Sequence, residues 1–175
     1  MKVNRYEDII NLDKAGNELL SVCRSIRNFN ADAWIEAKRA MIDDFMKKNN
    51  RNAIVLGISG GIDSAVALKL LQGSPEYRVF PVNISIASGT TDQDKARALA
   101  SSLDNSVATC DLTEIAETMA KTLYSSIAGK NDEGAGLWSK GQLSSCLRSP
   151  AFYFIASFLS DRGYRPGVCG TINRS

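Results

Sequence analysis

Histidine is absent from this chain of 175 residues. Its absence excludes Ser-His-Asp and Cys-His nucleophilic catalysis, because both use an imidazole as the general base. It also excludes every metal site that relies on a histidine ligand. Any reaction that the chain catalyses must therefore proceed without an imidazole group.

Cysteine is scarce and scattered. The four cysteines are Cys23, Cys110, Cys146 and Cys169, and no two of them form a CxxC pair. This spacing is not that of a disulfide scaffold, nor of a zinc or iron–sulfur site. We expect separate, reduced thiols in or near the hydrophobic core.

Long apolar runs and an excess of one charge are also missing. The longest apolar stretch, residues 151–159, is interrupted by Ser157 and is about half the length needed to span a bilayer. The first residues contain no apolar signal core. With 21 basic and 19 acidic residues the net charge is only +2, which does not favour binding of DNA or RNA. We expect a soluble cytoplasmic protein without a membrane or nucleic-acid partner.

The hydrophobic pattern changes near residue 50. Residues 1–50 carry apolar residues at helical spacing, which predicts N-terminal helices that pack on a following domain. Residues 51–175 alternate short β-branched runs with amphipathic segments, and this alternation predicts an α/β domain with a parallel sheet. The expected strands are 53–58, 79–86, 107–110 and 167–170, and the expected helices are 62–72, 91–103, 111–127 and about 143–161.

In such sheets ligands bind beyond the carboxyl ends of the strands. Three loops are expected there, at residues 59–64, 85–92 and 171–175. The first reads Ser59-Gly60-Gly61-Ile62-Asp63-Ser64 and joins a buried strand directly to a helix. Its glycines allow a sharp turn and a close ligand approach, and the helix start offers backbone N–H groups to an anion.

The hydroxyls of Ser59 and Ser64 can add further donors, so the loop predicts a phosphate or pyrophosphate site. The alternative is a plain strand-to-helix turn with two glycines. Asp63 would repel phosphate unless a cation lies between them, which suggests Mg²⁺; alternatively it only complements the helix N-terminus. No lysine follows the glycines and no GxGxxG is present, so neither a Walker A loop nor a dehydrogenase-type dinucleotide loop is supported.

The loop resembles the SGGxDS pyrophosphate loop of the N-type ATP pyrophosphatases, and other segments resemble the NAD synthase family within that group. These segments are Val55-Leu56-Gly57-Ile58, Ala65-Val66, Thr90-Thr91-Asp92-Gln93-Asp94-Lys95-Ala96, Lys140-Gly141-Gln142-Leu143, and Cys169-Gly170-Thr171-Ile172-Asn173-Arg174-Ser175. The resemblance covers roughly residues 30–175. It implies an adenine nucleotide alpha hydrolase-like fold, a Rossmann-like three-layer sandwich with helices on both faces of the parallel sheet.

The resemblance also implies an activity. NAD synthases convert deamido-NAD, ATP and ammonia to NAD, AMP and pyrophosphate through an adenylated carboxylate. By position, the ATP phosphates would be held by Gly57, Ile58, Ser59, Gly60, Gly61, Ile62, Asp63 and Ser64. Asp63 would be the catalytic residue that ligates Mg²⁺, Thr171 would contact ATP, and Lys140 and Arg148 would bind the substrate. The family also implies a homodimer, and a glutaminase domain or subunit could supply ammonia.

The chain departs from the family pattern at three positions and at its end. Gln142 replaces an asparagine, and Ser145 and Cys146 replace the alanine and first arginine of the ARxR motif. The second metal carboxylate would come one residue after Ser175, so we expect an N-terminal fragment that is inactive alone. The alternatives are another N-type ATP pyrophosphatase with a different substrate and a truncated, non-catalytic nucleotide-binding module.

Two of the expected helices carry apolar side chains close together. One consists of Ile115, Met119, Leu123 and Ile127, which recur at helical spacing. The other is the aromatic run Phe152, Tyr153, Phe154 and Phe158. The aromatic run is expected to be ordinary core, with a dimer interface as the alternative.

Overall fold

The computed structural model describes residues 29–86, 90–102, 106–127, 134 and 136–170. The chain divides into two compact units, Met1–Ala37 and Lys38–Ser175. In the first unit, the described residues hold the start of helix α3 (Ala31–Lys48). The Asn30 side chain accepts a hydrogen bond from the Ala33 amide at 3.0 Å, which is a normal way to cap a helix N-terminus.

The second unit is built around a four-stranded parallel sheet. Its strands are β1 (Ala53–Gly57), β2 (Arg78–Ser85), β3 (Ala108–Asp111) and β4 (Pro166–Cys169), in the spatial order β3-β2-β1-β4. Strand β1 pairs with β2 from Ala53 opposite Arg78, and with β4 from Ala53 opposite Pro166. The strand order reverses between β1 and β4, and ligands bind at such a switch point in open α/β sheets.

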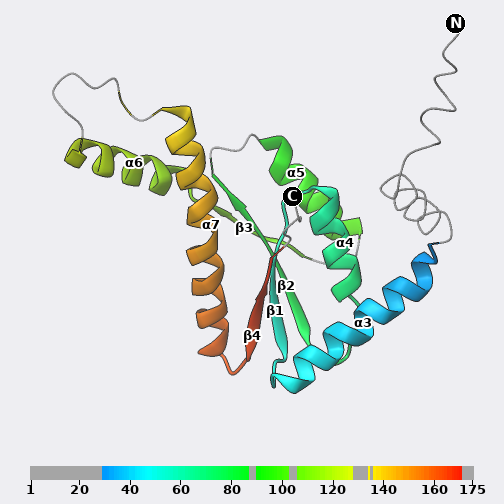
Figure 1. The fold of residues 1–175 in the computed structure, drawn as a ribbon. Coiled ribbons are helices and arrows are strands. Elements are labelled where there is room, and N and C mark those ends of the chain that lie inside the picture. The colour runs from blue at the N-terminus through cyan, green and yellow to red at the C-terminus, as the bar shows by residue number, and fades with distance from the viewer. Residues whose placement is uncertain (1–28, 87–89, 103–105, 128–133, 135, 171–175) are drawn as a thin grey trace, which may run out of the picture. The chain divides into compact units, whose positions relative to one another are not determined.

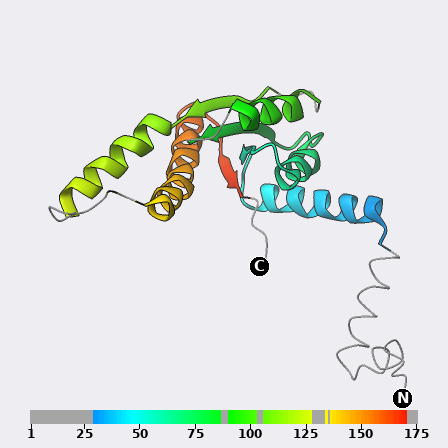
Figure 2. The same cartoon turned by 90° about the horizontal axis from the view of Figure 1, so that it is seen from above.

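Helices cover both faces of this sheet, as Figures 1 and 2 show. Helices α4 (Ile62–Leu71) and α5 (Thr90–Ser102) lie on one side, and α6 (Thr113–Ile127) and α7 (Leu137–Ser160) lie on the other. The predicted α/β fold with a parallel sheet and helices on both faces is therefore confirmed.

Strand β1 is buried on both faces because it is the inner strand between two helical layers. Ile54, Leu56 and Ile58 pack in the core under α4 and α5, whereas Val55 packs in the core under α6 and α7. On β2, Phe80, Val82 and Ile84 lie in the second core, together with Ile86 just after the strand. The period-2 alternation of strand side chains explains both assignments.

Pro81 determines where β2 and β3 begin to pair. The β2 residues that bond to β1 are even-numbered (the Arg78 amide donates to Asn52, and Val82 accepts from Ile58). The backbone N–H and C=O groups of odd-numbered residues of β2 point toward β3. On that side the Ser85 carbonyl accepts a hydrogen bond from the Leu112 amide. Since proline has no N–H, Pro81 offers β3 no donor. Pairing accordingly starts at Val82, opposite Ala108.

The helix bounds agree with the sequence except at α7. This helix begins at Leu137 instead of near Leu143, and Pro150 lies inside it, although proline is commonest in the first turn of a helix. Glycine explains the agreement at the end of α4, since Gly73 has φ +84° just after this helix and a left-handed glycine is a common helix stop. Among the helices of the described ranges, none is both long and apolar enough to cross a membrane.

Several apolar and sulfur-containing side chains lie closer to the surface than predicted. Cys110 and Cys146 are exposed and only Cys169 is half-buried, which corrects the expectation of thiols in or near the core; Cys23 lies outside the described residues. Burial raises the pKa of the Cys169 thiol. The apolar face of α6 is exposed, and on α7 only Phe152 of the aromatic run packs in the core. Tyr153, Phe154 and Phe158 are exposed, so their assignment to the core was wrong.

Candidate functional site

The loop at residues 59–64 lies at the carboxyl end of the central strand β1, where the sequence places it. Ile58 is buried and its amide still donates to Val82 of β2 at 2.8 Å, so the sheet holds the chain up to this residue. Gly60 then turns the backbone with φ +81°. Helix α4 begins at Ile62, two residues later. The strand, the turn and the helix start therefore follow each other without a spacer.

The helix start has the features of an anion site. Gly61 is the N-cap of α4, and no side chain caps it. The N–H groups of a helix's first turn have no acceptor within the helix, and the helix dipole adds positive potential there. Asp63 lies in this first turn with an exposed side chain. A carboxylate at this place could bind a cation that also binds phosphate oxygens.

Two of the loop's amides are already hydrogen-bonded within the loop. The Gly61 amide donates to the Ser59 hydroxyl oxygen at 3.2 Å, and the Ser59 amide donates to the Ser64 hydroxyl oxygen at 3.3 Å. Ser64 is buried, and its hydroxyl donates to the Gly61 carbonyl at 2.9 Å. In this conformation the hydroxyl groups of the two serines bond to the loop's own backbone. They were predicted to donate hydrogen bonds to a ligand.

The loop is packed against neighbouring elements from two sides. A Cβ atom on Gly60 would lie 2.8 Å from Cβ of Lys95 and 3.1 Å from the Ala96 amide, both in α5. A Cβ atom on Gly57 would lie 2.7 Å from the ring of Phe152 in α7. At Gly60 the neighbours are backbone and Cβ atoms, so close packing requires glycine there. At Gly57 a side chain would displace the tip of the Phe152 ring.

A third contact comes from β2. The side-chain amide of Asn83 donates to the Ile58 carbonyl at 2.7 Å, and Asn83 is buried. Asn83, Phe152 and Lys95 were not among the predicted site residues, although Lys95 lies in the family-like segment 90–96 and Phe152 in the aromatic run. The available signal for Asn83 was a polar residue within an otherwise apolar strand that ends beside the candidate loop.

Arg148 lies at the same edge of the sheet. Its Nε donates to the Ile84 carbonyl at 3.3 Å and its Nη1 donates to the Ser144 carbonyl at 3.4 Å. Since β1 ends at Gly57, opposite Val82, the Ile84 carbonyl lies beyond the last paired residue of β1. The half-buried guanidinium thus binds a strand end near the loop, and Arg148 is not a fully solvated helix charge.

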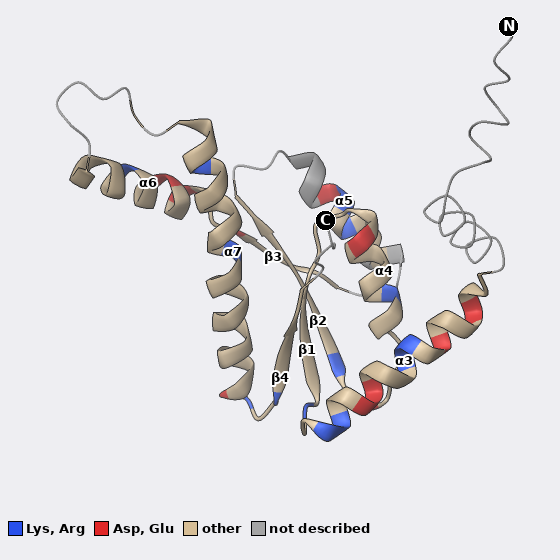
Figure 3. Ribbon diagram, viewed as in Figure 1, with Lys and Arg blue, Asp and Glu red and all other residues tan. Residues whose placement is uncertain are grey.

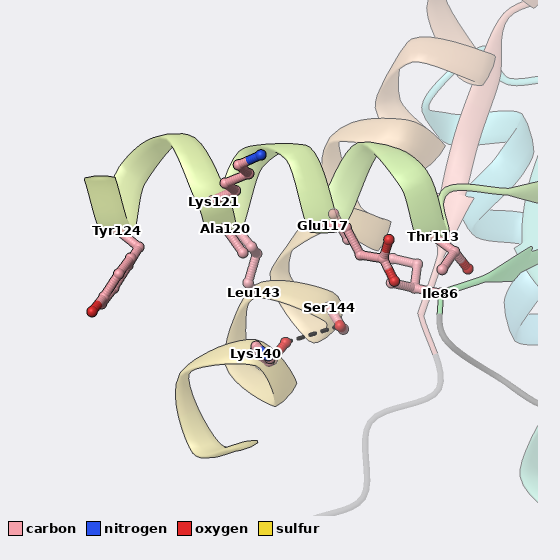
Figure 4. A pocket seen from close by; sticks show the side chains of 10 residues that line it. Ile86, Thr113, Glu117, Ala120, Lys121, Tyr124, Lys140, Leu143 and Ser144 are labelled. Carbon is pink, nitrogen blue, oxygen red and sulfur yellow. Dashed lines mark hydrogen bonds between the residues drawn. The ribbon is translucent and has the colours of Figure 1, made fainter. Parts of the chain in front are cut away.

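Lys140 lies two helical turns before Arg148 and lines a different cavity. This pocket, of about 350 Å³, lies between α6 and α7 next to Ile86 at the end of β2. Figure 4 shows the start of α7, with Lys140 and Ser144, beside the α6 residues Glu117 and Ala120. The Ser144 hydroxyl donates to the Lys140 carbonyl at 2.9 Å. Lys140 and Arg148 therefore lie on one helix but in different places. Lys140 lines the pocket between α6 and α7, whereas Arg148 binds the end of β2.

Other predicted site residues fall outside the description. Thr171 and the rest of the loop at residues 171–175 lie outside the described residues, as do residues 87–89 of the loop after β2. Within the described ranges, no cluster of three or more cysteine, aspartate or glutamate side chains could hold a metal ion. The roles assigned to Asp63 and Thr171 therefore stay predictions.

Known proteins resemble the chain in sequence. A family model described as NAD synthase matches residues 34–163. The NH₃-dependent NAD⁺ synthetase of Burkholderia cenocepacia is 30% identical over 107 residues, which make up 57% of this chain and 38% of that protein. The chain thus spans about two fifths of the length of the curated relatives it matches.

Solved structures resemble the chain in fold. An NH₃-dependent NAD synthetase from Campylobacter jejuni aligns with a TM-score of 0.68 at 22% identity, covering 83% of this chain and 58% of that one. An NMN synthetase from Francisella tularensis aligns with a TM-score of 0.67 at 24% identity, covering 83% and 56%. At these identities the likeness concerns the fold, and the two neighbours share it to the same degree.

Proposed function

Because the chain belongs to the NAD synthase family, we propose that it carries the ATP-binding part of a ligase that converts deamido-NAD, ATP and ammonia to NAD, AMP and pyrophosphate. In this reaction ATP transfers its adenylyl group to the substrate carboxylate, pyrophosphate leaves, and ammonia displaces AMP to form the amide. The observation that carries the proposal is the loop at residues 59–64, which joins the end of central strand β1 to the uncapped start of α4.

The proposed reaction suits a chain without histidine. A carboxylate and ammonia are nucleophiles already, so neither requires an imidazole base to activate it. Catalysis can rest on holding the reactants in line and on neutralising the phosphate charge. The segment from Gly57 to Ser64, which includes the loop, would position the phosphates through its backbone and through the start of α4.

Asp63 would hold Mg²⁺ together with the phosphate oxygens. Its exposed carboxylate, in the first turn of the helix that faces the phosphates, fits this role, since Mg²⁺ commonly takes one or two protein carboxylates plus phosphates and water. When bound, the ion would lower the negative charge that the leaving pyrophosphate develops. Thr171 completes the proposed ATP contacts.

The carboxylate substrate is the finer part of the proposal. Arg148 has two donors directed at carbonyl oxygens in this structure, and it remains our candidate for substrate binding together with Lys140. Cys146, where the family pattern has arginine, is exposed on α7. This difference favours a second candidate function, in which the same chemistry acts on a smaller carboxylate such as nicotinate mononucleotide. The third alternative is a nucleotide-binding module without catalysis.

We also propose a homodimer, a separate source of ammonia such as a glutaminase domain or subunit, and a cytoplasmic location. The support for the homodimer is the exposed apolar surface of α6 and α7. The ammonia source and the location stay predictions from the sequence.

Calorimetric titration tests the function on the full chain. We expect ATP with Mg²⁺ to bind, and Asp63→Asn to weaken that binding by about tenfold or more while ATP without Mg²⁺ is affected less. Arg148→Ala should retain ATP binding and lose the binding of deamido-NAD. Preferred binding of nicotinate mononucleotide would select the second candidate. No binding of ATP with Mg²⁺ by the unsubstituted chain would refute the proposal.

A further inference from the structure

Asn83 is a buried polar residue in the apolar core strand β2. Only 5% of its surface is exposed. By the alternation of strand side chains it points to the face of the sheet that α4 and α5 cover, because Val82 and Ile84 pack on the opposite face. A polar side chain in such a place needs hydrogen-bond partners to offset its loss of water.

Asn83 has such a partner at one end of its side chain only. Its Nδ2 donates to the Ile58 carbonyl at 2.7 Å. Its Oδ1 is buried and has no hydrogen-bond partner among the described residues. A leucine of similar shape would avoid the cost of that unpaired oxygen. The polar residue is therefore explained by the bond at the other end of its side chain. That bond ends at the Ile58 carbonyl, directly before the loop at residues 59–64, which we call the phosphate loop.

The bonded carbonyl lies at a critical point of the backbone. Ile58 is the last residue whose amide bonds to the sheet, through the Val82 carbonyl. The next residues are Ser59 and Gly60, where the chain turns with φ +81°. Fixing the Ile58 carbonyl sets the orientation of the Ile58–Ser59 peptide plane, which also contains the Ser59 amide at the start of the turn. If the carbonyl lost its partner, it would have to rotate toward water, and the loop amides would rotate with it.

We propose that Asn83 is a positioning residue for the phosphate loop, which fixes the direction of the loop's backbone N–H groups by holding the Ile58 carbonyl. The inference rests on the proposed function of the loop, and it adds a residue that touches neither phosphate nor metal. Anion sites made of backbone amides depend on their orientation, because preorganised donors need no rearrangement when the ligand arrives. Asn83 supplies that preorganisation from the neighbouring strand.

The test compares three variants of the full chain by titration with MgATP and with Mg²⁺–pyrophosphate. Asn83→Leu removes the donor at similar shape and also removes the unpaired oxygen. Asn83→Asp, studied at pH 8, keeps the shape but lacks the donor. Val79→Ala is the matched control, because Val79 packs in the core on the same face of the same strand, opposite Ile54 and at the end of β2 remote from the loop.

We expect both Asn83 variants to weaken the binding of both ligands by about tenfold, and Val79→Ala to change either affinity by less than about twofold. Without any ligand, backbone amides at residues 58–64 should exchange hydrogen faster in the Asn83 variants than in the control. Hydrogen exchange reports directly how well the loop backbone is ordered. It requires only that one of the two Asn83 variants folds.

The outcomes separate the inference from the function. If the unsubstituted chain binds both ligands and Asn83→Leu binds them equally well with unchanged loop exchange, the positioning role is refuted and the function stands. If the unsubstituted chain binds neither ligand, the proposed function fails and the inference fails with it. Equal losses of binding in Asn83→Leu and Val79→Ala would also refute the inference, because they would indicate a general disturbance of β2.

Discussion

At the scale of single residues, Gly60 is the position where the loop tolerates least change. It combines a left-handed backbone with close contact to α5, whose Lys95 Cβ would lie 2.8 Å from an added Cβ. Gly73 has nearly the same backbone, with φ +84°, but nothing lies within 4 Å of the place where its Cβ would be. The two glycines therefore separate the cost of conformation from the cost of packing.

We predict that Gly60→Ala destabilises the chain by about 2–4 kcal/mol and abolishes detectable ATP binding, because the left-handed backbone and the contact with α5 both oppose a side chain. Gly73→Ala should cost only about 1–2 kcal/mol and leave ATP affinity unchanged. Chemical denaturation and calorimetric titration measure both quantities. Similar losses of stability and affinity in the two variants would contradict the packing argument.

Individual residues of the site differ in how far the sequence could predict them. The position of the turn was predictable, because adjacent glycines between a buried strand and a helical segment mark a sharp change of direction. The hydrogen bonds of Ser59 and Ser64 within the loop were not, since a hydroxyl can face either a ligand or its own backbone. Asn83 and Phe152 were also missed, because contacts between distant segments depend on strand order and helix rotation.

At the scale of elements, the start of α6 shows how one side chain joins a strand to a helix. Asp111 ends β3, and its Oδ1 accepts hydrogen bonds from the Thr113 hydroxyl at 2.6 Å and the Thr113 amide at 2.9 Å. These bonds, the hydroxyl first, lower the pKa of the Asp111 carboxyl. A lowered pKa means that this contribution to stability is present above the ordinary pKa near 4 and is lost as pH falls through the lowered value.

We predict that Thr113→Val raises the pKa of Asp111 toward its ordinary value, because the variant keeps the backbone bond and loses the stronger hydroxyl bond. Carbon-detected NMR titration of the Asp111 carboxyl measures this change. Thr122→Val is the control, since the Thr122 hydroxyl donates to the Thr118 carbonyl within the same helix and should not affect Asp111. Identical titration midpoints for Thr113→Val and the unsubstituted chain would contradict the prediction.

Among the elements, the strands and the helices α4 to α6 were predictable to within two residues, because glycine, proline and buried β-branched runs mark their ends. The start of α7 was not. Its N-cap is Gly136 without a side-chain cap, so the usual polar signal is absent. Pro150 suggested a boundary, yet packing of Leu147, Ala151 and Ile155 on the sheet keeps the helix continuous across it.

At the scale of the whole molecule, apolar surface remains exposed on the outer sides of α6 and α7. The exposed side chains on α6 are Ile115, Met119, Leu123 and Ile127, and those on α7 are Leu137, Trp138, Tyr153, Phe154 and Phe158. Figure 3 shows how few charges α7 carries, with Lys140 and Arg148 as its only charged residues. Apolar patches of this kind mark interaction surfaces in soluble proteins.

If the patch forms the proposed homodimer, Phe154→Glu should shift the chain from dimer to monomer, because a buried carboxylate without a partner is costly. Sedimentation velocity measures the distribution. Val66→Glu is the matched control, since Val66 is also an exposed apolar residue but lies on α4. A chain that is monomeric without any substitution, at concentrations of about 100 times a typical micromolar dissociation constant, would contradict the dimer.

The alternation of strands and helices was sufficient to predict a parallel sheet, but it could not predict the order β3-β2-β1-β4. Which strand lies beside β1 depends on crossovers on both faces, and the local pattern is the same for several orders. The exposed face of α6 illustrates the same limit. Its spacing at 115, 119, 123 and 127 predicts one apolar face correctly, yet says nothing about whether this chain or another molecule covers it.

The central position of β1 affects the order in which its contacts can form during translation. A ribosome delivers β2 and α5 soon after the bend at Gly60, so Asn83 and Ala96 can engage it while the nascent chain is still short. The ring of Phe152 and the outer neighbour β4 emerge only much later. The bend would then contact β2 and α5 before α7 has been synthesised. The later packing of α7 on the sheet would complete the contacts around the bend.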